Sequence, residues 1–231
     1  MKYKRILLKL SGETLAGDAS SGINADGLKS VAREIKAVWQ KKVEIAVVIG
    51  AGNLWRGAGK SIDRVTADHM GMLATVINAL ALKDALRVEG IGAGVFSAID
   101  IPGFVTRYMR DSAVSFLECG NVVICAGGTG NPFFTTDTTA ALRAAELEAE
   151  VLLKATQVDG VYEADPKKNP AAKKFPTLSF DDAIEKQLKI MDTAAFSLCK
   201  ENDLPIIVFD FHKKGNLEKV VSGRTIGTLI R

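Results

Sequence analysis

The sequence predicts an α/β fold, a three-layer αβα sandwich around a central, mostly parallel sheet. Short runs of β-branched and apolar residues alternate with longer amphipathic runs, the pattern of repeated strand–helix–strand units. The run 43–49 is almost continuously apolar, which is typical of a central parallel strand buried on both faces. With 47% hydrophobic residues among 231, the chain can bury one sizeable core, and we expect a single domain over residues 1–231.

The first half of the chain follows this alternation closely. Helices are expected where apolar residues recur every three or four positions, as they do within 26–41, and strands where short apolar runs stand between them. In the helix expected at 66–89, an apolar stripe keeps the helical period, which either core packing or contacts between subunits would explain; its members are Met70, Leu73, Ile77, Leu80 and Ala81. The expected strands here are 4–10, 43–49, 91–97 and 121–126, and the other helix lies near 110–118.

The second half continues the pattern around one different stretch. Residues 163–176 hold three of the six prolines and four lysines, which predicts a surface loop. On either side we expect helices at 137–149, near 180–187, at 194–202 and near 216–221, and strands at 151–155, 205–209 and 225–230. In sheets of this kind, ligands bind at the carboxyl ends of the parallel strands, so the loops that follow the strands are the candidate ligand site.

Composition excludes several classes of protein. Lysine and arginine number 30 against 27 acidic residues, a net charge of +3 that is slight for a nucleic-acid binder, and 25% charged residues with so much apolar content exclude a disordered chain. The N-terminus lacks the apolar core of a signal peptide, and no long apolar run predicts a membrane span. We therefore expect a cytoplasmic protein that binds neither membrane nor nucleic acid.

The number and spacing of the cysteines also agree with a reducing, cytoplasmic compartment. Cys119, Cys125 and Cys199 are an odd number without CxxC spacing, and the chain has only two histidines. A Cys/His zinc site is therefore not expected, and we expect three buried thiols.

The first two strand-end loops suit anions. Lys9-Leu10-Ser11-Gly12 ends the first expected strand, and Gly12 permits a tight turn beside a lysine, although an ordinary loop with a solvated lysine explains it equally. The second loop, 50–59, combines small residues with Arg56, a bidentate donor; a plain glycine turn is the alternative. It is not a P-loop, because Leu54 stands where that motif needs glycine, and Trp55 breaks a dinucleotide-binding GxGxxG.

The third loop is the most informative. Residues 127–137 pack glycines, threonines, an asparagine and an aspartate directly before a helix, a donor set that suits phosphate, ribose or a base edge. Thr136 or Asp137 could also simply cap that helix. The next strand carries Lys154, which is costly to bury unpaired, so we expect it at a sheet edge or paired with Asp137 or Asp192.

These residues predict electrostatic rather than nucleophilic chemistry. No GxSxG or HExxH motif is present, and the lone His69 on a helix is more simply structural. Anion loops, two lysines, an arginine and one or two carboxylates are what phosphoryl transfer needs, since that reaction depends on charge stabilisation and alignment.

Six segments together resemble one known group. They are KLSGE at 9–13, GAGNLWRG at 50–57, DHMGMLAT at 68–75, GTGNPFFTTD at 128–137, LLKATQVDGVYEADP at 152–166 and KIMD at 189–192. In this order they resemble the bacterial uridylate kinases, a branch of the amino-acid-kinase family, over essentially the whole chain. The resemblance implies the amino-acid-kinase fold and transfer of the ATP γ-phosphoryl group to UMP with Mg²⁺, as a nucleoside monophosphate kinase of pyrimidine nucleotide biosynthesis.

The resemblance also implies roles for particular residues. Catalysis would fall to Lys9, Lys154 and Asp137, with Asp137 and Asp192 as candidates near the metal. ATP would contact Lys9, Leu10, Ser11, Gly12, Gly52, Arg56, Thr156, Gln157, Tyr162 and Asp165. UMP would contact Ala51, Asp68, Thr129, Gly130, Asn131, Pro132, Phe133, Phe134, Thr135 and Thr136.

Two departures from the family's pattern stand out. The second loop usually reads Gly-Gly-Gly-Asn, and Ala51 replaces its middle glycine, which costs stability only where the backbone φ is positive. The segment that matches the family's effector region is unusual in composition; it comprises Gly17, Asp18, Ala19, Ser20, Ser21 and Gly22. Activation by GTP, inhibition by UTP and a homohexamer built from dimers are implied by the resemblance alone.

Two alternatives remain open at this level. A relative with another acceptor, such as a carbamate, glutamate or aspartate kinase, would not need the 129–136 cluster as a nucleotide pocket. A nucleotide-sensing regulator without activity could have lost Lys9, Asp137 and Lys154, which this chain retains.

Overall fold

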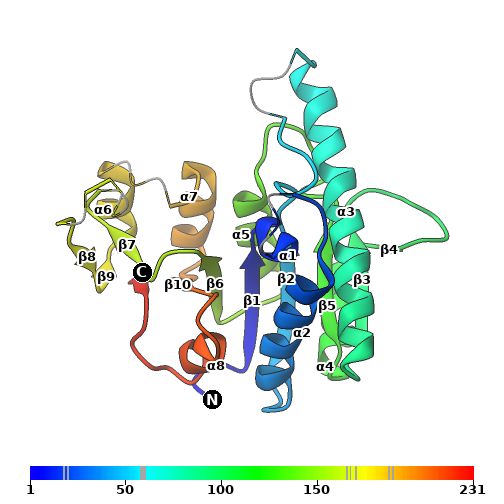
Figure 1. The fold of residues 1–231 in the computed structure, drawn as a ribbon, viewed down its shortest axis with the longest axis horizontal. Helices are drawn as coiled ribbons and strands as arrows, with labels where there is room; N and C mark the ends of the chain where they lie inside the picture. The colour runs from blue at the N-terminus through cyan, green and yellow to red at the C-terminus, as the bar shows by residue number, and fades with distance from the viewer. Residues whose placement is uncertain are drawn as a thin grey trace.

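A nine-stranded sheet forms the centre of the molecule. The computed structural model describes residues 1–17, 19, 21–57, 61–164, 166, 168–169, 171–186, 188 and 190–231. The sheet order is β4-β3-β5-β2-β1-β6-β10-β11-β9 (Figure 1). Its strands are β1 (Arg5–Leu10), β2 (Glu44–Ile49), β3 (Ala93–Ser97), β4 (Thr106–Arg107), β5 (Val122–Ala126), β6 (Val151–Thr156), β9 (Thr177–Leu178), β10 (Ile206–Asp210) and β11 (Thr228–Ile230).

Seven strands of this sheet run parallel, and their register decides which side chains lie next to each other at their carboxyl ends. β1 lies between β2 and β6, parallel to both, whereas β11 pairs antiparallel with β10. The β1–β6 register places Lys9 directly opposite Lys154. Because neighbouring residues in register point to the same face of a sheet, the two lysines share one face near the carboxyl ends of the two strands.

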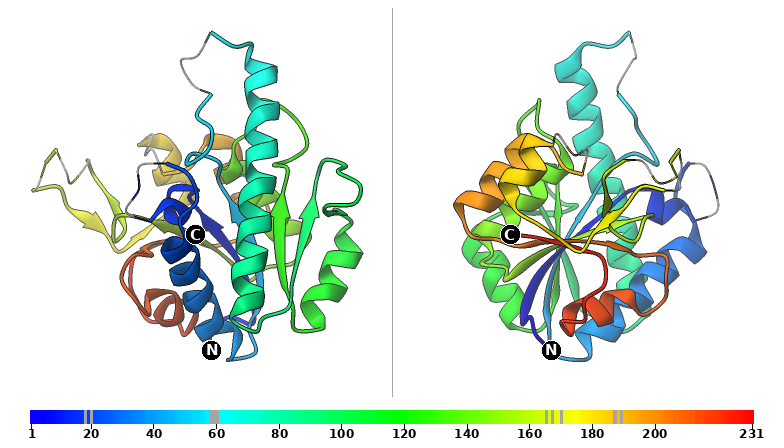
Figure 2. Two further views of the ribbon diagram at one scale, coloured as in Figure 1. Left: turned by 45° about the vertical axis from the view of Figure 1, so that its right-hand side comes forward. Right: turned by 90° about the vertical axis from the view of Figure 1, so that its left-hand side faces the viewer.

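Helices cover both faces of the sheet, as the three-layer prediction requires (Figure 2). One face packs against α1 (Glu13–Ala16), α2 (Ala25–Trp39), α3 (Arg64–Val88) and α8 (Asn216–Val221). The other packs against α4 (Arg110–Glu118), α5 (Thr136–Glu146), α6 (Phe180–Glu185) and α7 (Thr193–Glu201). β1 shows the alternation: Ile6, Leu8 and Leu10 enter the first core, and Leu7 enters the second.

The predicted elements are confirmed, and the unpredicted ones are short. α2 begins after Asn24, whose Oδ1 accepts hydrogen bonds from two backbone N–H groups of the first turn, and it buries Val31, Ala32 and Ile35 at helical spacing. The structure adds the single turn α1 and several two-residue strands. Two of these, β7 (Val161–Tyr162) and β8 (Lys174–Phe175), form an antiparallel pair outside the main sheet, so part of the expected 163–176 loop is strand.

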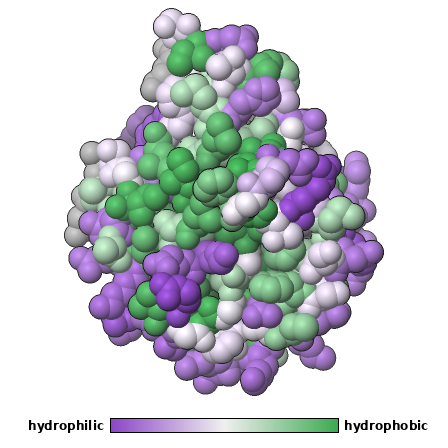
Figure 3. Space-filling view, turned by 90° about the vertical axis from the view of Figure 1, so that its right-hand side faces the viewer, coloured by the Kyte–Doolittle hydropathy of each residue, from purple (hydrophilic) through white to green (hydrophobic). Residues whose placement is uncertain are grey.

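Helix α3 packs mainly with residues outside the expected stripe, although Leu80 of that stripe packs against the first core. Met72, Val76, Ala79, Leu82 and Leu86 are buried, while Met70, Leu73 and Ile77 are exposed. By length and composition alone α3 could cross a membrane, contrary to the expectation that no such run exists, but here its inner face forms part of the first core. The outward stripe contributes to a hydrophobic surface patch (Figure 3).

One prediction about the thiols is wrong. Cys125 and Cys199 are buried as expected, and burial raises the pKa of each to about 12. Cys119 is exposed, because it is the C-terminal cap of α4 at the surface of the molecule.

Candidate active site

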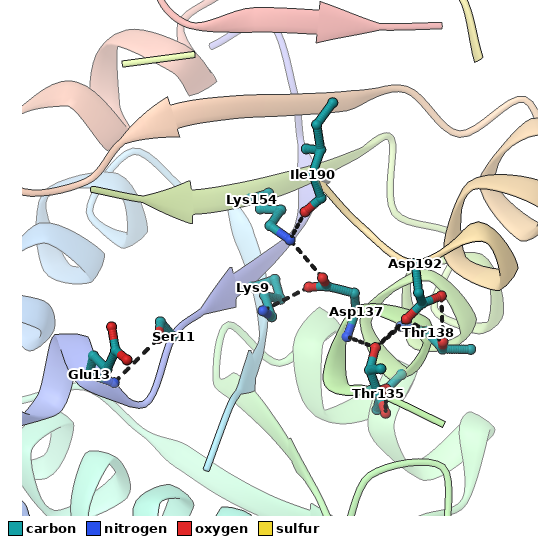
Figure 4. Close-up of polar contacts among 10 residues, drawn as sticks. Lys9, Ser11, Glu13, Thr135, Asp137, Thr138, Lys154, Ile190 and Asp192 are labelled. Carbon is teal, nitrogen blue, oxygen red and sulfur yellow. Dashed lines mark hydrogen bonds and ion pairs between the residues drawn. The ribbon is translucent and has the colours of Figure 1, made fainter. Parts of the chain in front are cut away.

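A carboxylate between two lysines lies at the carboxyl end of the central strands. The Asp137 Oδ2 atom is 2.6 Å from Lys154 Nζ, and Asp137 Oδ1 is 2.7 Å from Lys9 Nζ (Figure 4). The three side chains are 11–16% exposed. Lys154 Nζ also donates to the Ile190 carbonyl oxygen. Of the alternatives for Lys154, pairing with Asp137 is confirmed, and the edge position is wrong because β6 lies between β1 and β10.

Charge pairing decides the ionisation of this cluster. Burial alone would raise the pKa of Asp137, but the adjacent Lys9 and Lys154 ammonium groups outweigh it and hold that pKa below its ordinary value. Burial lowers the pKa of Lys154, and the Asp137 carboxylate opposes this shift only in part. The ionised Asp137 carboxylate thus lies between two lysine side chains, a geometry that suits the binding of an anion.

The start of α5 places Asp137 in this position. Thr135 is the N-cap: its Oγ1 accepts from the Asp137 N–H at 3.0 Å and from the Thr138 N–H at 3.4 Å. The expectation that Thr136 or Asp137 caps this helix is therefore wrong by one or two positions. Asp192, the N-cap of α7, accepts hydrogen bonds from the Thr135 and Thr138 hydroxyls and from the Ala195 N–H, so it fastens α7 to the start of α5 (Figure 4).

The first two anion loops lie against each other. A Cβ atom at Gly12 would collide with Asn53 Oδ1 and with the Gly50 carbonyl oxygen, so only glycine permits this approach. Ala51 is not among the residues with positive φ, and it therefore replaces glycine without backbone strain. Leu10 is fully buried in the first core, and its carbonyl oxygen accepts a hydrogen bond from the Gly50 N–H. Leu10 therefore connects the start of the second loop to the core.

Arg56 is oriented toward the first loop. Its guanidinium forms an ion pair with Glu13, and its Nε donates to the Gly52 carbonyl oxygen at 3.0 Å. The Glu13 N–H in turn donates to Ser11 Oγ at 3.3 Å (Figure 4). The predicted ATP residues of both loops are thus brought together, with Glu13 as a partner that the sequence analysis missed.

A first cavity of about 520 Å³ opens beside these loops. Of the predicted UMP residues it is lined by Ala51, Asp68, Thr129, Asn131, Phe134, Thr135 and Thr136, whereas Gly130, Pro132 and Phe133 do not line it. Trp55, Arg64 and Thr75 are lining residues that the sequence analysis missed.

Asp68 ties the cavity's two walls together. Its Oδ2 accepts the Phe133 N–H at 2.7 Å and pairs with Arg64 at 2.8 Å. Partial burial would raise the pKa of Asp68, but these two donors lower it below its ordinary value. Phe133 has φ 72°, a conformation unusual for a residue with a side chain, and the bond to Asp68 helps to hold it.

A second cavity of about 670 Å³ lies on the other side of the lysine–aspartate cluster. Three predicted residues line it, Lys154, Thr156 and Tyr162, together with apolar residues that the sequence analysis missed, Val158, Val161, Leu188, Ile190 and Val208. Gln157 is not a lining residue, and Asp165 falls outside the described residues. Tyr162 donates its hydroxyl hydrogen to Asp159 Oδ1 at 2.6 Å, so the aromatic ring is fixed at the entrance.

The cluster thus separates two ligand spaces. Thr136 lines the first cavity, its neighbour Asp137 belongs to the cluster, and Lys154 lines the second cavity. An anionic group carried by a ligand in the second cavity would meet the Lys154 ammonium group, which shares Asp137 with Lys9, although Lys9 itself lines neither cavity. The arrangement suits transfer of an anionic group between two ligands.

The expected effector segment is partly described. Gly17 and Gly22 have φ values of 60° and 85°, which favour glycine, and Gly22 exchanges hydrogen bonds with Asn53. Ala19 and Ser21 belong to the same surface segment, whereas Asp18 and Ser20 fall outside the described residues.

Comparisons with known proteins agree on one family. The sequence profile of the amino acid kinase family matches residues 4–210. The structure is similar to that of the UMP kinase from Bacillus anthracis, with a TM-score of 0.97 and 38% identity over 100% of this chain and 97% of that chain. It is also similar to the UMP kinase from Ureaplasma parvum, with a TM-score of 0.93 and 37% identity over 100% and 99% of the two chains. A uridylate kinase from Archaeoglobus fulgidus matches with a TM-score of 0.76 and 28% identity over the full length of both.

Proposed function

The chain belongs to the amino acid kinase family, and we propose that it is a UMP kinase, which transfers the γ-phosphoryl group of ATP to UMP to form UDP and ADP. The observation that carries this proposal is the Lys9–Asp137–Lys154 cluster between two cavities. A phosphoryl group that passes between two nucleotides spreads negative charge over its oxygens, and two fixed ammonium groups stabilise that charge in the transition state.

Each cavity takes one nucleotide in this proposal. UMP occupies the first, where threonine hydroxyls, Asn131 and Asp68 supply polar contacts and Phe134 supplies an aromatic face. ATP occupies the second, where Val161, Leu188 and Val208 offer apolar walls to the adenine and Tyr162 and Thr156 add polar groups. Its phosphates extend over Ser11, Gly12, Gly52 and Arg56 toward Lys9. A carboxylate acceptor would leave the hydroxyl-rich first cavity without a use.

Within the cluster, the lysines contact the phosphoryl group and Asp137 positions them. Lys9 and Lys154 both contact one carboxylate, so their ammonium groups are held a fixed distance apart. This arrangement requires no reorganisation when charge develops, and that is the main source of electrostatic catalysis.

Magnesium fits this site only as a companion of ATP. Among the described residues there is no group of three or more acidic, cysteine or histidine side chains that could hold a metal ion. Asp137 already faces two ammonium groups, and both Asp192 oxygens accept hydrogen bonds from Thr138, so neither candidate ligand is free for a cation. Because Mg²⁺ often keeps its waters and binds through substrate phosphates, we propose that it enters as the ATP complex.

An assay of acceptors tests the function directly. Purified protein is incubated with ATP and Mg²⁺ against UMP, CMP, dUMP, glutamate and carbamate, and ADP release is measured with a coupled system. Turnover that is fastest with UMP is the expected result. Activity confined to glutamate or carbamate would overturn the proposal.

We further propose that the enzyme is a cytoplasmic homo-oligomer, a hexamer built from dimers, with GTP and UTP as effectors. The support is the apolar stripe of Met70, Leu73 and Ile77, which is exposed on a single chain and suits contact with a second copy. The effector segment 17–22 would transmit to the site through Gly22, which is bonded to Asn53 beside the second loop.

A further inference from the structure

Two buried asparagines form a closed pair beneath the anion loops. Asn53 is 3% exposed and Asn78, on α3, is fully buried. Each side-chain amide donates to the other's oxygen, at 3.0 Å from Asn53 Nδ2 to Asn78 Oδ1 and 2.8 Å in the reverse direction. Buried amides are costly unless every donor is bonded, and here the remaining donors also have partners.

The remaining donors hold two different segments of backbone. Asn78 Nδ2 donates to the Gly50 carbonyl oxygen at 2.8 Å, and Asn53 Nδ2 donates to the Gly22 carbonyl oxygen at 2.8 Å. The Gly22 N–H returns a bond to the Asn53 carbonyl oxygen, also at 2.8 Å. One pair of side chains therefore joins α3, the second anion loop and the 17–22 segment.

The bond to Gly50 also sets the direction of a donor. In a trans peptide the carbonyl and the following N–H point in opposite directions, so a Gly50 carbonyl that faces Asn78 turns the Ala51 N–H away from α3. Neither the Ala51 nor the Gly52 N–H donates a hydrogen bond to any part of the chain that the structure describes. Ala51 lines the first cavity, where such donors can bind an anion.

The first anion loop depends on the same pair. Gly12 packs so closely on Asn53 Oδ1 and the Gly50 carbonyl oxygen that no side chain fits between them. Within the described part of the chain, the hydrogen bonds that orient the Asn53 side chain are those with Asn78 and Gly22. A substitution at Asn78 would therefore alter the positions of both loops, although Asn78 itself lies beneath them.

We propose that Asn78 is a positioning residue for phosphoryl transfer, acting through Asn53 and the Gly50 carbonyl to aim the N–H groups of Ala51 and Gly52 at the phosphates. The inference rests on the proposed function for its substrate. In this proposal, replacing Asn78 lowers kcat by more than the accompanying loss of stability would explain.

The experiment compares three variants of the full-length protein. Asn78→Leu removes one amide, and the double variant Asn53→Leu/Asn78→Leu removes the pair. Leu86→Ala is the matched control, because Leu86 is fully buried on the same helix and belongs to the core rather than to the site. For each we measure the melting temperature, kcat and KM for UMP well below that temperature, and amide hydrogen exchange of residues 50–55 with and without UMP and a non-hydrolysable ATP analogue.

The proposal expects turnover and stability to separate. In Asn78→Leu, kcat falls at least tenfold while KM for UMP rises less than threefold, and nucleotides no longer protect residues 50–55 from exchange although they still protect 133–136. The double variant regains part of the melting temperature, because no buried side-chain amide is left half-bonded, although the Gly22 and Gly50 carbonyls still lack their donors. It does not regain kcat. Leu86→Ala lowers the melting temperature and keeps kcat within twofold.

Opposite results would overturn it. If kcat follows the melting temperature across all variants, or if nucleotides do not protect residues 50–55 in the unaltered protein, Asn78 is merely structural. If Asn78→Leu does not fold, Asn78→Asp receives the same measurements, since it keeps the acceptor for Asn53 and loses the donor to Gly50. If the unaltered protein does not phosphorylate UMP, the proposed function fails, and nucleotide-dependent protection of the loop still decides the role of Asn78.

Discussion

The two lysines of the cluster come from different strands and pair with the same carboxylate. Lys9 and Lys154 face each other across neighbouring strands, and the carboxylate between them belongs to a helix of the covering layer. Neither ammonium group can move away without leaving Asp137 buried beside a single partner. The position of positive charge is therefore built into the fold before any nucleotide binds.

Replacing Lys154 should affect turnover more than binding. In Lys154→Met we expect kcat to fall by about 10²-fold or more and KM for UMP to change less than fivefold, because the ammonium group gains its strongest contact when charge develops in the transition state. Steady-state kinetics with saturating ATP measures both constants. Lys83→Met, at an exposed position of α3, is the control and should behave as the unaltered protein. A rise in KM at constant kcat would contradict the assigned role.

The ionisation of Asp137 should make stability depend on pH. Because its pKa in the folded protein lies below the ordinary value of 3.8, the ionised carboxylate stabilises the fold above that value, and this contribution is lost as pH falls through the lower folded pKa. In Asp137→Asn, we expect a loss of about 3 kcal/mol at pH 7, the usual cost of breaking a buried pair. Urea unfolding at pH 7, 5 and 3 measures it; a difference between the two proteins that is the same at all three pH values would disprove this account.

At the scale of elements, α5 and α7 act as one unit at the edge of the site. Thr135 caps α5, Asp192 caps α7, and the two caps are hydrogen-bonded to each other. Caps usually contribute stability to their own helix only. Here the cap of α7 also sets where α5 begins, and with it the position of Asp137 and of the threonines that line the first cavity.

Removing the carboxylate of Asp192 should therefore alter substrate binding as well as stability. In Asp192→Ala we expect a loss of about 1–2 kcal/mol from the lost cap and a severalfold rise in KM for UMP, because Thr135 loses its acceptor. Ser179→Ala is a suitable control, since Ser179 caps α6 through the same kind of bond at 2.9 Å and lies outside both cavities. Equal KM values for Asp192→Ala and the unaltered protein would refute the coupling.

Element prediction from the sequence succeeded where the signal is local. Among the described residues, periodicity located every helix except the single turn α1, and the apolar runs located the seven longer strands. The N-cap of α5 was missed because three consecutive residues, Thr135 to Asp137, can all cap a helix. The two-residue strands β4, β7, β8 and β9 carry no pattern of their own, since their partners are decided by tertiary packing.

The meeting of Lys9, Asp137 and Lys154 was predictable to a similar degree. Lys9, Asp137 and Lys154 stand at strand ends or at a helix start, positions that the pattern of the chain exposes. Asn53 and Asn78 are 25 residues apart and meet only in the folded protein, so no spacing rule indicates their pairing. The apolar walls of the second cavity were missed for the same reason, because Val161, Leu188 and Val208 come from three separate segments.

At the scale of the whole molecule, α3 has two apolar faces, one buried in the first core and one exposed at the surface. Its inner face forms part of the first core, and its outer face exposes Leu73 and Ile77 by 51% and 53%. Single exposed apolar residues are common, whereas several on one helix face form a patch that favours association (Figure 3).

Charging this outer face should change the oligomeric state. We expect Leu73→Lys/Ile77→Lys to shift the protein to smaller species in sedimentation velocity experiments, because two like charges would face their copies across the contact. Lys29→Glu, an exposed change on α2, is the control and should leave the sedimentation coefficient as it is. If the double variant sediments as the unaltered protein does, this face is not the contact between copies.

The place of β1 in the sheet also has a consequence for synthesis on the ribosome. β1 can pair with β2 as soon as residue 49 has left the exit tunnel, but its other neighbour, β6, ends at residue 156 of 231. Until β6 has been made, this apolar edge of β1 has no permanent partner, the state in which nascent chains aggregate most readily. The nascent chain therefore needs protection longest along the strand that carries Lys9, and the Lys9–Asp137–Lys154 cluster can form only after β6 has been made.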